Sequence, residues 1–396
     1  MARIHSMVVV VSVLLFVSCR SQHNKVYEPW YQHALQQSEK QLLLAAESFT
    51  DSAKNPRTYE HGAVELVLHT DWTSGFFPGS LWYMYELTGN EQLKTAADRA
   101  TWFIEQAQYR TNTHDLGFII HCSFGNAYRI TGDTSYVGVM KQGIRSLMTR
   151  YNSNIGLIRS WDFGDWQFPV IIDNMMNIEF VYEMGKMNDD STLMHAAVSH
   201  ADRTLENHFR ADNSSVHVVD YDTITGAVLL KQTHQGYNDE SSWARGQAWV
   251  LYGYTMMYRF TGNPAYLQQA EKIAAFILNH PRLPEDKIPY WDFDAPNIPD
   301  EPRDASAAAV IASALIELSG FVHDKPVYFQ TAEQMLKVLS SEQYLAKPGE
   351  NGLFILKHST GNWPKNSEID TPLSYADYYY LEALKRYGAI KYTKTK

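Results

Sequence analysis

Two aspartates stand in segments where a carboxyl group could carry out acid–base chemistry. Asp173 lies in FPVIIDNMMNIEF, at the expected start of a helix and among apolar residues. Apolar surroundings raise the pKa of a carboxyl group, which can then donate a proton near neutral pH. Asp115, in THDLGF, also precedes an expected helix. The two predict a pair of catalytic carboxyl groups, although Asp173 could instead be a helix N-cap. Asp71 is a third, weaker candidate, since DWTSG is typical of a capping turn.

A strongly polar stretch, THQGYNDESSWARGQAW, covers residues 233–249. It places Trp243, Arg245 and Trp249 close together on one expected helix. The planar guanidinium of Arg245 could hold a carboxylate through two parallel hydrogen bonds. Its alternative role is a structural ion pair with Asp239 or Glu240.

The sequence gives no reason to expect a metal or a cofactor. His114, His217 and His234 do not have the spacing of metal ligands, and neither HExxH nor CxxC occurs. Neither a GxSxG motif nor a glycine-rich phosphate loop is present. The chemistry is therefore expected to rest on side chains alone.

Repeated helical hairpins are expected to position these residues. Residues 81–104, 125–148 and 251–278 each read as an aromatic-rich helix, a Thr-Gly-Asn/Asp turn and an amphipathic helix. The glycine would end the first helix and the Asn or Asp would cap the second. The predicted helices are 31–49, 75–88, 91–108, 117–131, 134–150, 173–186, 190–208, 243–261, 264–279, 304–320, 326–341 and 374–388. We expect an all-α fold, an (α/α)6 toroid of six hairpins, with a small β-hairpin at 216–230; an open solenoid is the alternative.

The even-numbered helices, which would form the inner ring, follow loops rich in aromatic and polar residues. These loops are 71–74, 114–115, 161–173, 234–243, 291–304 and 359–374. The chemistry therefore collects at the N-terminal ends of the inner helices, where free N–H groups and the helix dipole favour an anionic ligand. Aromatic rings there would offer platforms for sugars.

The N-terminus predicts export. Residues 7–18 (MVVVVSVLLFVS) have the length of a signal-peptide core, and Ser18-Cys19 is typical of a bacterial lipoprotein cleavage site. We expect a signal peptide at 1–18, a lipid on Cys19, a tether over 19–30 and one catalytic domain over 31–392. With Cys19 modified by the lipid, Cys122 would be the one remaining thiol and could not form an intrachain disulfide. The protein would be a periplasmic or outer-membrane lipoprotein of a Gram-negative bacterium, attached to the membrane only through Cys19.

Composition restricts the class of partner. The chain has 396 residues, of which 45% are hydrophobic, enough for one large core. Its formal net charge of −10 argues against nucleic-acid binding. A local arginine could still hold an anionic small substrate.

Six segments resemble glycoside hydrolase family 88, the unsaturated glucuronyl hydrolases. They are DWTSGFFPGSLWYMYELTGN, HDLGF, IIDNMMN, SSWARGQAW, PRDASAAAV and SYADYYYLEAL, spread over residues 71–384 in the family's order. The resemblance implies a toroid that releases the unsaturated uronic acid from the ends of lyase-cut oligosaccharides, among which glycosaminoglycan fragments are expected. It makes Asp173 the general acid and base that hydrates the C4=C5 double bond, and Asp115 the residue that holds sugar hydroxyls and tunes Asp173.

The same matching implies further substrate contacts. Trp72, Phe76, Trp161, Trp243 and Trp249 resemble platform residues, and His114, His217, Thr233, His234, Gln235 and Arg245 resemble polar contacts. Ser359, Asn362 and Lys365 lie in the region that selects sulfate in the family, but their spacing departs from its pattern. Two alternatives are the related family 105, which acts on unsaturated rhamnogalacturonides, and a non-catalytic sugar-binding lipoprotein.

We predict that Cys19→Ala releases an active protein from the membrane, because the lipid on this residue would be its only attachment. Fractionation of cells grown with labelled fatty acid would measure this. Wild-type protein that carries no label would contradict it.

Overall fold

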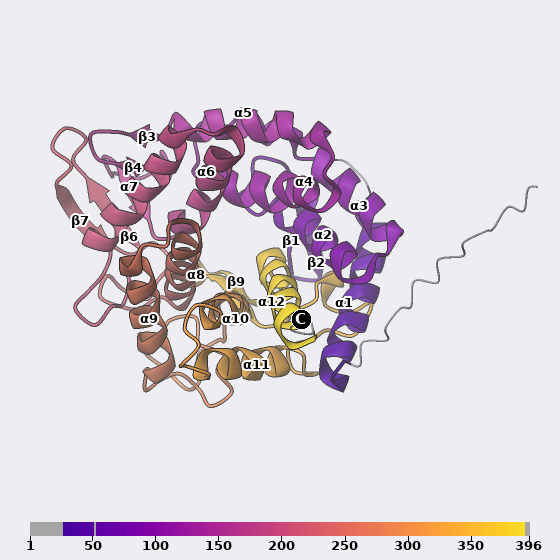
Figure 1. Cartoon of the computed structure of the whole chain (residues 1–396). Coiled ribbons are helices and arrows are strands. Elements are labelled where there is room, and N and C mark those ends of the chain that lie inside the picture. The colour runs from indigo at the N-terminus through magenta and orange to yellow at the C-terminus, as the bar shows by residue number, and fades with distance from the viewer. Residues whose placement is uncertain (1–26, 51–52, 393–396) are drawn as a thin grey trace, which may run out of the picture.

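The computed structural model describes residues 27–50 and 53–392, and its helices form a closed ring (Figure 1). The inner helices are α2 (Phe76–Thr88), η2 and α4 (Gly117–Gly125 and Asn126–Thr131), α6 (Asn174–Asn188), α8 (Ala244–Thr261), α10 (Ala305–Ser319) and α12 (Ser374–Tyr392). Each inner segment packs against the next, and α12 packs against α2. The expected (α/α)6 toroid is confirmed, and the open solenoid is excluded.

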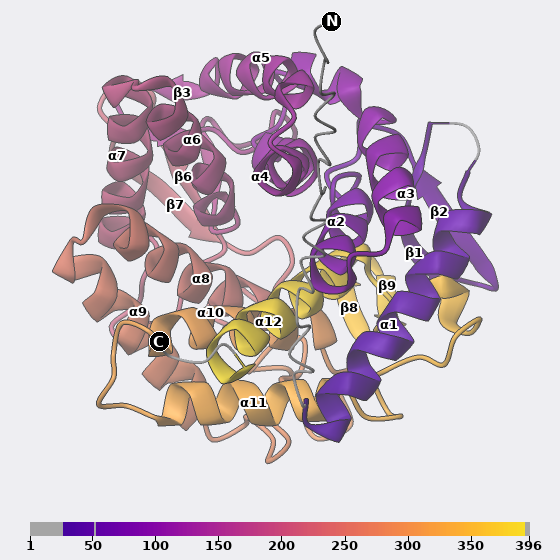
Figure 2. The ribbon, with the colours of Figure 1, turned by 45° about the vertical axis from the view of Figure 1, so that its right-hand side comes forward.

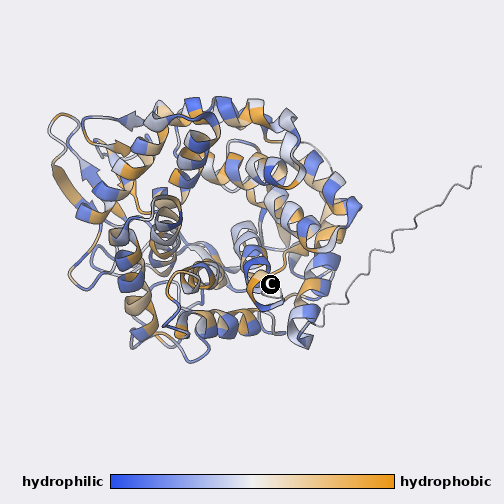
Figure 3. Ribbon diagram, in the orientation of Figure 1, coloured by the Kyte–Doolittle hydropathy of each residue, from blue (hydrophilic) through white to orange (hydrophobic). Residues whose placement is uncertain are grey.

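An outer layer of helices surrounds this ring (Figure 2). Its members are α1 (Pro29–Ser48), α3 (Glu91–Trp102), α5 (Val137–Met148), α7 (Ser191–Asn207), α9 (Pro264–Asn279) and α11 (Val327–Leu339). Hydrophobic and hydrophilic residues alternate along outer helices such as α5 (Figure 3), because one side faces the inner ring and the other faces solvent. The inner helices are buried on most sides, and α10 consists almost entirely of buried residues.

The Thr-Gly-Asn/Asp turns have the predicted geometry. Gly89, Gly132 and Gly262 end their helices with φ values of 74°, 70° and 66°. Glycine adopts this left-handed conformation without the steric cost of a Cβ atom. The side chains of Asn90, Asp133 and Asn263 then accept a hydrogen bond from a backbone N–H in the following helical turn.

Three predicted helices differ in their hydrogen bonding. The range 91–108 divides into α3 and a 3-10 helix, η1 (Glu105–Tyr109), and 134–150 begins with a 3-10 turn, η3 (Thr134–Tyr136). The first part of 117–131, η2, is a π-helix. Periodic burial is similar in these related helix types, so the amphipathic pattern does not separate them.

The predicted hairpin at 216–230 is present, as β6 (Val218–Tyr221) and β7 (Val228–Gln232), but β5 (Pro169–Ile171) adds a third strand to it. Three other hairpins were not predicted. They are β1 and β2 (Asn55–Glu60 and Ala63–Val67), β3 and β4 (Tyr151–Asn152 and Leu157–Ile158), and β8 and β9 (Ser359–Asn362 and Ser367–Thr371). These strands are only two to six residues long, which is too short for an alternation of apolar and polar residues to stand out in the sequence.

The expected signal peptide, Cys19 and most of the tether lie outside the described residues. The last two tether positions, 29 and 30, already belong to α1. Across residues 27–50 and 53–392, no helix combines the length and apolar character needed to cross a bilayer.

Glycines allow the inner helices to touch. A Cβ atom on Gly117 would lie 2.6 Å from the Cα atom of Asn177 on α6. Backbone cannot move aside cheaply, so we predict that Gly117→Ala destabilises the protein by about 1–3 kcal/mol. Gly138→Ala on α5, where nothing lies within 4 Å, is the matched control and should be neutral or stabilising by up to about 1 kcal/mol. Chemical denaturation of both variants measures the difference, and equal effects would contradict the proposed contact.

Candidate active site

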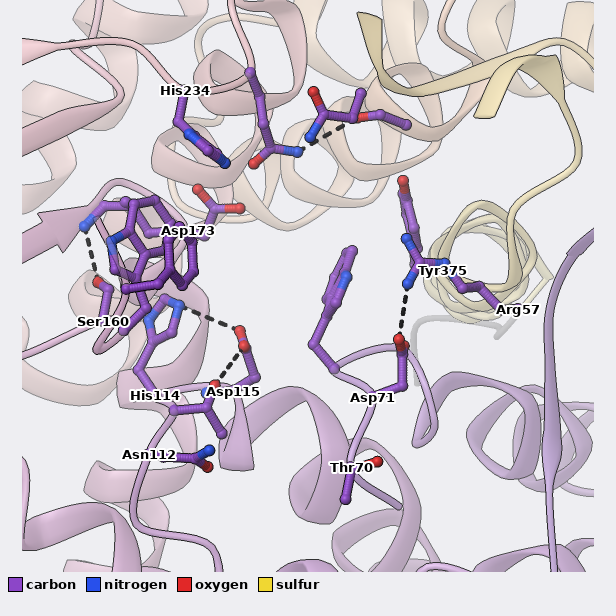
Figure 4. A pocket seen from close by; sticks show the side chains of 18 of the residues that line it. Arg57, Thr70, Asp71, Asn112, His114, Asp115, Ser160, Asp173, His234 and Tyr375 are labelled. Atoms are coloured by element: carbon purple, nitrogen blue, oxygen red, sulfur yellow. Dashed lines mark hydrogen bonds and ion pairs between the residues drawn. The ribbon is translucent and has the colours of Figure 1, made fainter. Parts of the chain in front are cut away.

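A pocket of about 380 Å³ opens at the N-terminal ends of the inner helices (Figure 4). This volume suits a small ligand. Its lining comes from several of the loops that were expected to carry the chemistry and from the hairpins β1–β2 and β8–β9. The lining residues are Arg57, Thr70, Asp71, Trp72, Arg110, Asn112, Thr113, His114, Asp115, Ser160, Trp161, Phe163, Ile171, Asp173, His234, Gln235, Gly361, Asn362, Glu368 and Tyr375.

Asp173 lines this pocket and is 6% exposed. It immediately precedes α6, yet its side chain makes no capping hydrogen bond. Burial raises the pKa of Asp173 to about 7, Arg245 opposes the rise, and the charge of Asp115 adds to it. The carboxyl group can therefore both donate and accept a proton near neutral pH.

His217, on the segment before β6, faces Asp173. Its Nδ1 accepts hydrogen bonds from the backbone N–H groups of His234 and Gln235, at 3.0 and 3.1 Å. Burial and the nearby His234 lower the pKa of His217 well below its usual range, so the ring is neutral. Its single proton must then be on Nε2, which lies 3.6 Å from Oδ2 of Asp173. His217 thus points a fixed donor toward the buried carboxyl group.

Asp115 projects from the same side of the pocket as Asp173, whereas Asp71 stands across from them (Figure 4). Oδ2 of Asp115 accepts a hydrogen bond of 2.6 Å from the hydroxyl of Thr113. Its Oδ1 lies 3.2 Å from Nε2 of His114. With a side chain 19% exposed, Asp115 is more open to the pocket than Asp173 and is held in one orientation from two sides.

An ion-pair network forms the opposite wall. Arg57 on β1 pairs with Asp71 at 2.7 Å and with Glu368 on β9 at 2.7 Å. The carboxylates hold the pKa of Arg57 above its usual range despite burial. Tyr375, at the start of α12, lies beside this network and stacks at an angle on Trp72, with ring centroids 4.9 Å apart.

Aromatic rings form a second wall. Trp161 and Phe163 stack with centroids 4.6 Å apart and an interplanar angle of 20°. His234 lies 5.3 Å from Trp161 by the same measure. Phe163 is 51% exposed, so this face is open at the rim. Flat apolar surfaces beside polar groups are suited to sugar rings.

Several polar atoms of the pocket residues are buried and have no hydrogen-bond partner in the protein. They include Nδ1 of His114, Nε1 of Trp161, Oδ2 of Asp173, Nη1 of Arg110, Oδ1 of Asn362 and the hydroxyl of Tyr375. Leaving such groups unpaired costs about 1–3 kcal/mol each. A ligand rich in hydroxyl groups would satisfy both donors and acceptors of this set.

The structure brings Trp72, His114, Asp115, Trp161, Asp173, His234 and Gln235 together, as well as Asn362. It does not place the other predicted contacts on the pocket surface, namely Phe76, His217, Thr233, Trp243, Arg245, Trp249, Ser359 and Lys365. Phe76 and Trp249 are fully buried and pack around Phe118, so they support the pocket wall from behind. The hydroxyl of Thr233 accepts a hydrogen bond from the N–H of Gly236, which fixes the turn that carries His234.

Arg245 was predicted to hold a substrate carboxylate, but in the structure its guanidinium is buried and bound by other groups of the protein. Its guanidinium is 1% exposed, pairs with Asp304 at 3.0 Å and donates to the carbonyl oxygens of Thr360 and Gly361. It lies between the rings of Trp243 and Tyr375. The ion pair is therefore with Asp304, and not with Asp239 or Glu240. Arg245 anchors strand β8 from below and acts on Asp173 through its charge.

Several residues that line the pocket were not predicted from the sequence, and two of them, Arg57 and Tyr375, lie on the right-hand side of Figure 4. Arg57 and Glu368 belong to hairpins without a clear sequence signal, and neither was singled out. Arg110 and Asn112 immediately precede HDLGF and could have been found by extending that motif. Tyr375 lies within SYADYYYLEAL, which pointed to the family without indicating this position as a contact. Within the described part of the chain, no group of three His, Cys, Asp or Glu residues is arranged to hold a metal.

A sequence model of Glycosyl Hydrolase Family 88 matches residues 45–391. The chain belongs to this family. It is therefore a glycoside hydrolase, and the match decides between the two families considered from the sequence.

This chain is similar to several named proteins, both in sequence and in structure. The unsaturated glucuronyl hydrolase of Formosa agariphila is 52% identical over 326 residues, which cover 82% of this chain and 81% of that protein. The unsaturated chondroitin disaccharide hydrolase of Streptococcus agalactiae is 32% identical over 90% of this chain and 91% of its own length. The crystal structure of an unsaturated glucuronyl hydrolase specific for heparin superimposes with a TM-score of 0.90 at 56% identity, covering 91% of this chain and 98% of that one.

Because the pKa of Asp173 is raised, we predict that this residue changes how the stability of the folded protein depends on pH. Its pKa is 3.8 when unperturbed and about 7 in the folded protein, so the folded wild type loses stability as the pH rises from about 4 to about 7. Asp173→Asn cannot ionise and should escape this loss. Its stability relative to wild type should increase over that range and then level off, by on the order of a few kcal/mol.

Denaturation of both proteins across this pH range measures the effect. Asp377, whose pKa burial also raises to about 7, titrates in both proteins and cancels from the difference. A difference that does not vary with pH would show that Asp173 has an ordinary pKa.

Proposed function

We propose that this family 88 hydrolase removes the 4,5-unsaturated uronic acid from the non-reducing end of oligosaccharides that polysaccharide lyases have produced. Glycosaminoglycan fragments are the proposed substrates. The names of the relatives support this choice, since one acts on unsaturated chondroitin disaccharides and another is specific for heparin. A further solved structure, from Streptococcus agalactiae, is a complex with dGlcA-GalNAc6S; it is 30% identical with a TM-score of 0.77 and covers 90% of this chain and 91% of that one.

The observation that carries the proposal is the buried Asp173, with a pKa of about 7 and a second carboxyl group nearby. In the unsaturated sugar, C4 and C5 are joined by a double bond that is conjugated with the ring oxygen as a vinyl ether. Protonated Asp173 donates its proton to C4, which leaves a positive charge shared by C5 and the ring oxygen. The Asp173 carboxylate then accepts a proton from water as the water oxygen bonds to C5.

The hemiketal formed at C5 opens, and the linkage at C1 breaks with release of the reducing-end sugar. One water is consumed, and Asp173 regains its proton. This sequence needs no nucleophile at the anomeric carbon, unlike the usual two-carboxylate mechanisms.

Other residues position the sugar. Asp115 is oriented by Thr113 and His114 to accept hydrogen bonds from sugar hydroxyls. Its charge also favours the protonated form of Asp173. The Nε2 proton of His217 lies on the Asp173 side and stabilises the carboxylate that remains after proton transfer to C4.

We also propose that the protein is exported and anchored through a lipid on Cys19, since Ser18-Cys19 directly follows the apolar run at 7–18.

The mechanism predicts that only an unsaturated disaccharide is turned over. A saturated glucuronide lacks the C4=C5 bond that accepts the proton, so it should bind without reacting. Absorbance of the conjugated double bond follows the loss of the unsaturated substrate, and chromatography follows both. In heavy-oxygen water, the label should enter the uronic acid product at C5 and not the released sugar. Comparable rates on the two disaccharides would indicate chemistry at the anomeric carbon.

The same assay tests the role of Asp173. Asp173→Asn should lower the rate by at least about 10²- to 10⁴-fold, because one group serves both proton transfers. Asp165→Asn, an exposed aspartate in the loop before β5, is the matched control and should retain wild-type rates. A rate for Asp173→Asn above about a tenth of wild type would exclude it as the acid and base.

A further inference from the structure

Arg110 differs from the other arginines around the pocket. Arg57 pairs with Asp71 and Glu368, Arg150 with Asp162, and Arg245 with Asp304. Arg110 lines the pocket, but no carboxylate of the described residues lies within ion-pair distance of it. Its Nη1 atom is buried and has no hydrogen-bond partner. Among these arginines it is the one whose charge is left for a ligand.

The position of Arg110 is at the rim. It follows η1, next to Tyr109, which is 61% exposed, and the exposed Thr111 and Asn112. Asp173 is buried, with 6% of its surface exposed, whereas Arg110 is partly exposed. Since the reacting sugar must reach Asp173, its neighbour at the cleaved bond lies closer to the rim. Arg110 therefore faces the leaving sugar.

Arg110 is suited to an anionic ligand because its own positive charge has no ion-pair partner among the described residues. Asp115 and Asp71 attract the guanidinium from beyond ion-pair distance, while burial lowers its pKa by a larger effect. A partly buried guanidinium without an ion-pair partner gains most from an oxyanion, which it can bind through two parallel hydrogen bonds. A neutral hydroxyl would satisfy one N–H and leave the charge uncompensated.

We propose that Arg110 recognises a sulfate ester on the sugar next to the cleaved bond. This inference rests on the proposed function, because it takes the reacting sugar to lie at Asp173. It places sulfate recognition on the loop before Asp115. The C-terminal positions Ser359 and Lys365, by contrast, do not line the pocket.

Matched unsaturated glucuronyl–hexosamine disaccharides, without sulfate and with a sulfate at position 4 or 6 of the hexosamine, test the proposal. The measured quantity is the ratio of kcat/KM for a sulfated substrate to that for the unsulfated one, which cancels a general loss of folded enzyme. Arg110→Ala should lower this ratio at least about tenfold for one of the sulfated substrates. Arg110→Lys should lower it less, since it keeps the charge and loses the planar fork.

Two controls locate the effect. Arg145→Ala, at an exposed position on α5, should leave the ratio unchanged. Lys365→Ala tests the C-terminal segment directly. An unchanged ratio in Arg110→Ala, or a larger fall in Lys365→Ala, would overturn the proposal.

The outcome separates this inference from the proposed function. Wild-type turnover of the unsulfated disaccharide but of neither sulfated one would overturn the role of Arg110 and leave the function standing. Turnover of none of the three would overturn the function. Calorimetric binding to Asp173→Asn then tests Arg110 without turnover, because Asp173→Asn with Arg110→Ala should lose affinity for a sulfated disaccharide at least about tenfold more than for the unsulfated one. Equal losses would overturn the role of Arg110.

Discussion

Packing of α12 against α2 closes the ring, and the pocket depends on that closure. The two helices come from opposite ends of the chain, so their contact brings residues from both ends together at the pocket. The bond between Arg57 and Glu368, which joins positions 311 residues apart, spans this junction. Asp377 on α12 accepts the backbone N–H groups of Ile355 and Leu356, both at 2.8 Å, and so holds the chain that leads into β8. An open solenoid would leave these partners apart.

Inside the ring, burial and charge act in opposite directions on Asp173. Removal from water favours the neutral acid, and Arg245 favours the carboxylate. Burial has the larger effect, and the pKa settles at about 7, where the two forms are equally populated at neutral pH. Arg245 can stay buried near Asp173 because Asp304 and two carbonyl oxygens pair with its guanidinium, and the same pairing limits its effect on the pKa of Asp173. A closer, unpaired arginine would keep Asp173 ionised and remove its ability to donate a proton.

The sequence predicted the ring because three hairpins repeat the same signal, an aromatic-rich helix followed by Thr-Gly-Asn/Asp and an amphipathic helix, and the helical patterns together make six hairpins. It predicted Asp173 and Asp115 because both stand at the start of inner helices. It did not predict β1–β2 or β8–β9, whose strands are short and irregular, and therefore missed Arg57 and Glu368. The WARGQAW motif correctly indicated that Arg245 lies near the site. It did not indicate that the guanidinium is buried, because that burial depends on Asp304, 59 residues away. Such long-range pairings leave no local pattern.

The contact between η2 and α6 has a consequence for how enzymes of this shape can diversify. Oδ1 of Asn177 on α6 accepts the backbone N–H of Phe118 at 2.9 Å, beside the close approach of Gly117. Asp115 stands just before η2 and Asp173 just before α6, so this one contact fixes the spacing of the two carboxyl groups. The rim loops do not take part in it. Mutations can therefore accumulate in the rim and alter which sugars are accepted, while the reacting groups keep their geometry. Substrate range and chemistry therefore depend on different contacts, even where the residues responsible are neighbours in the sequence.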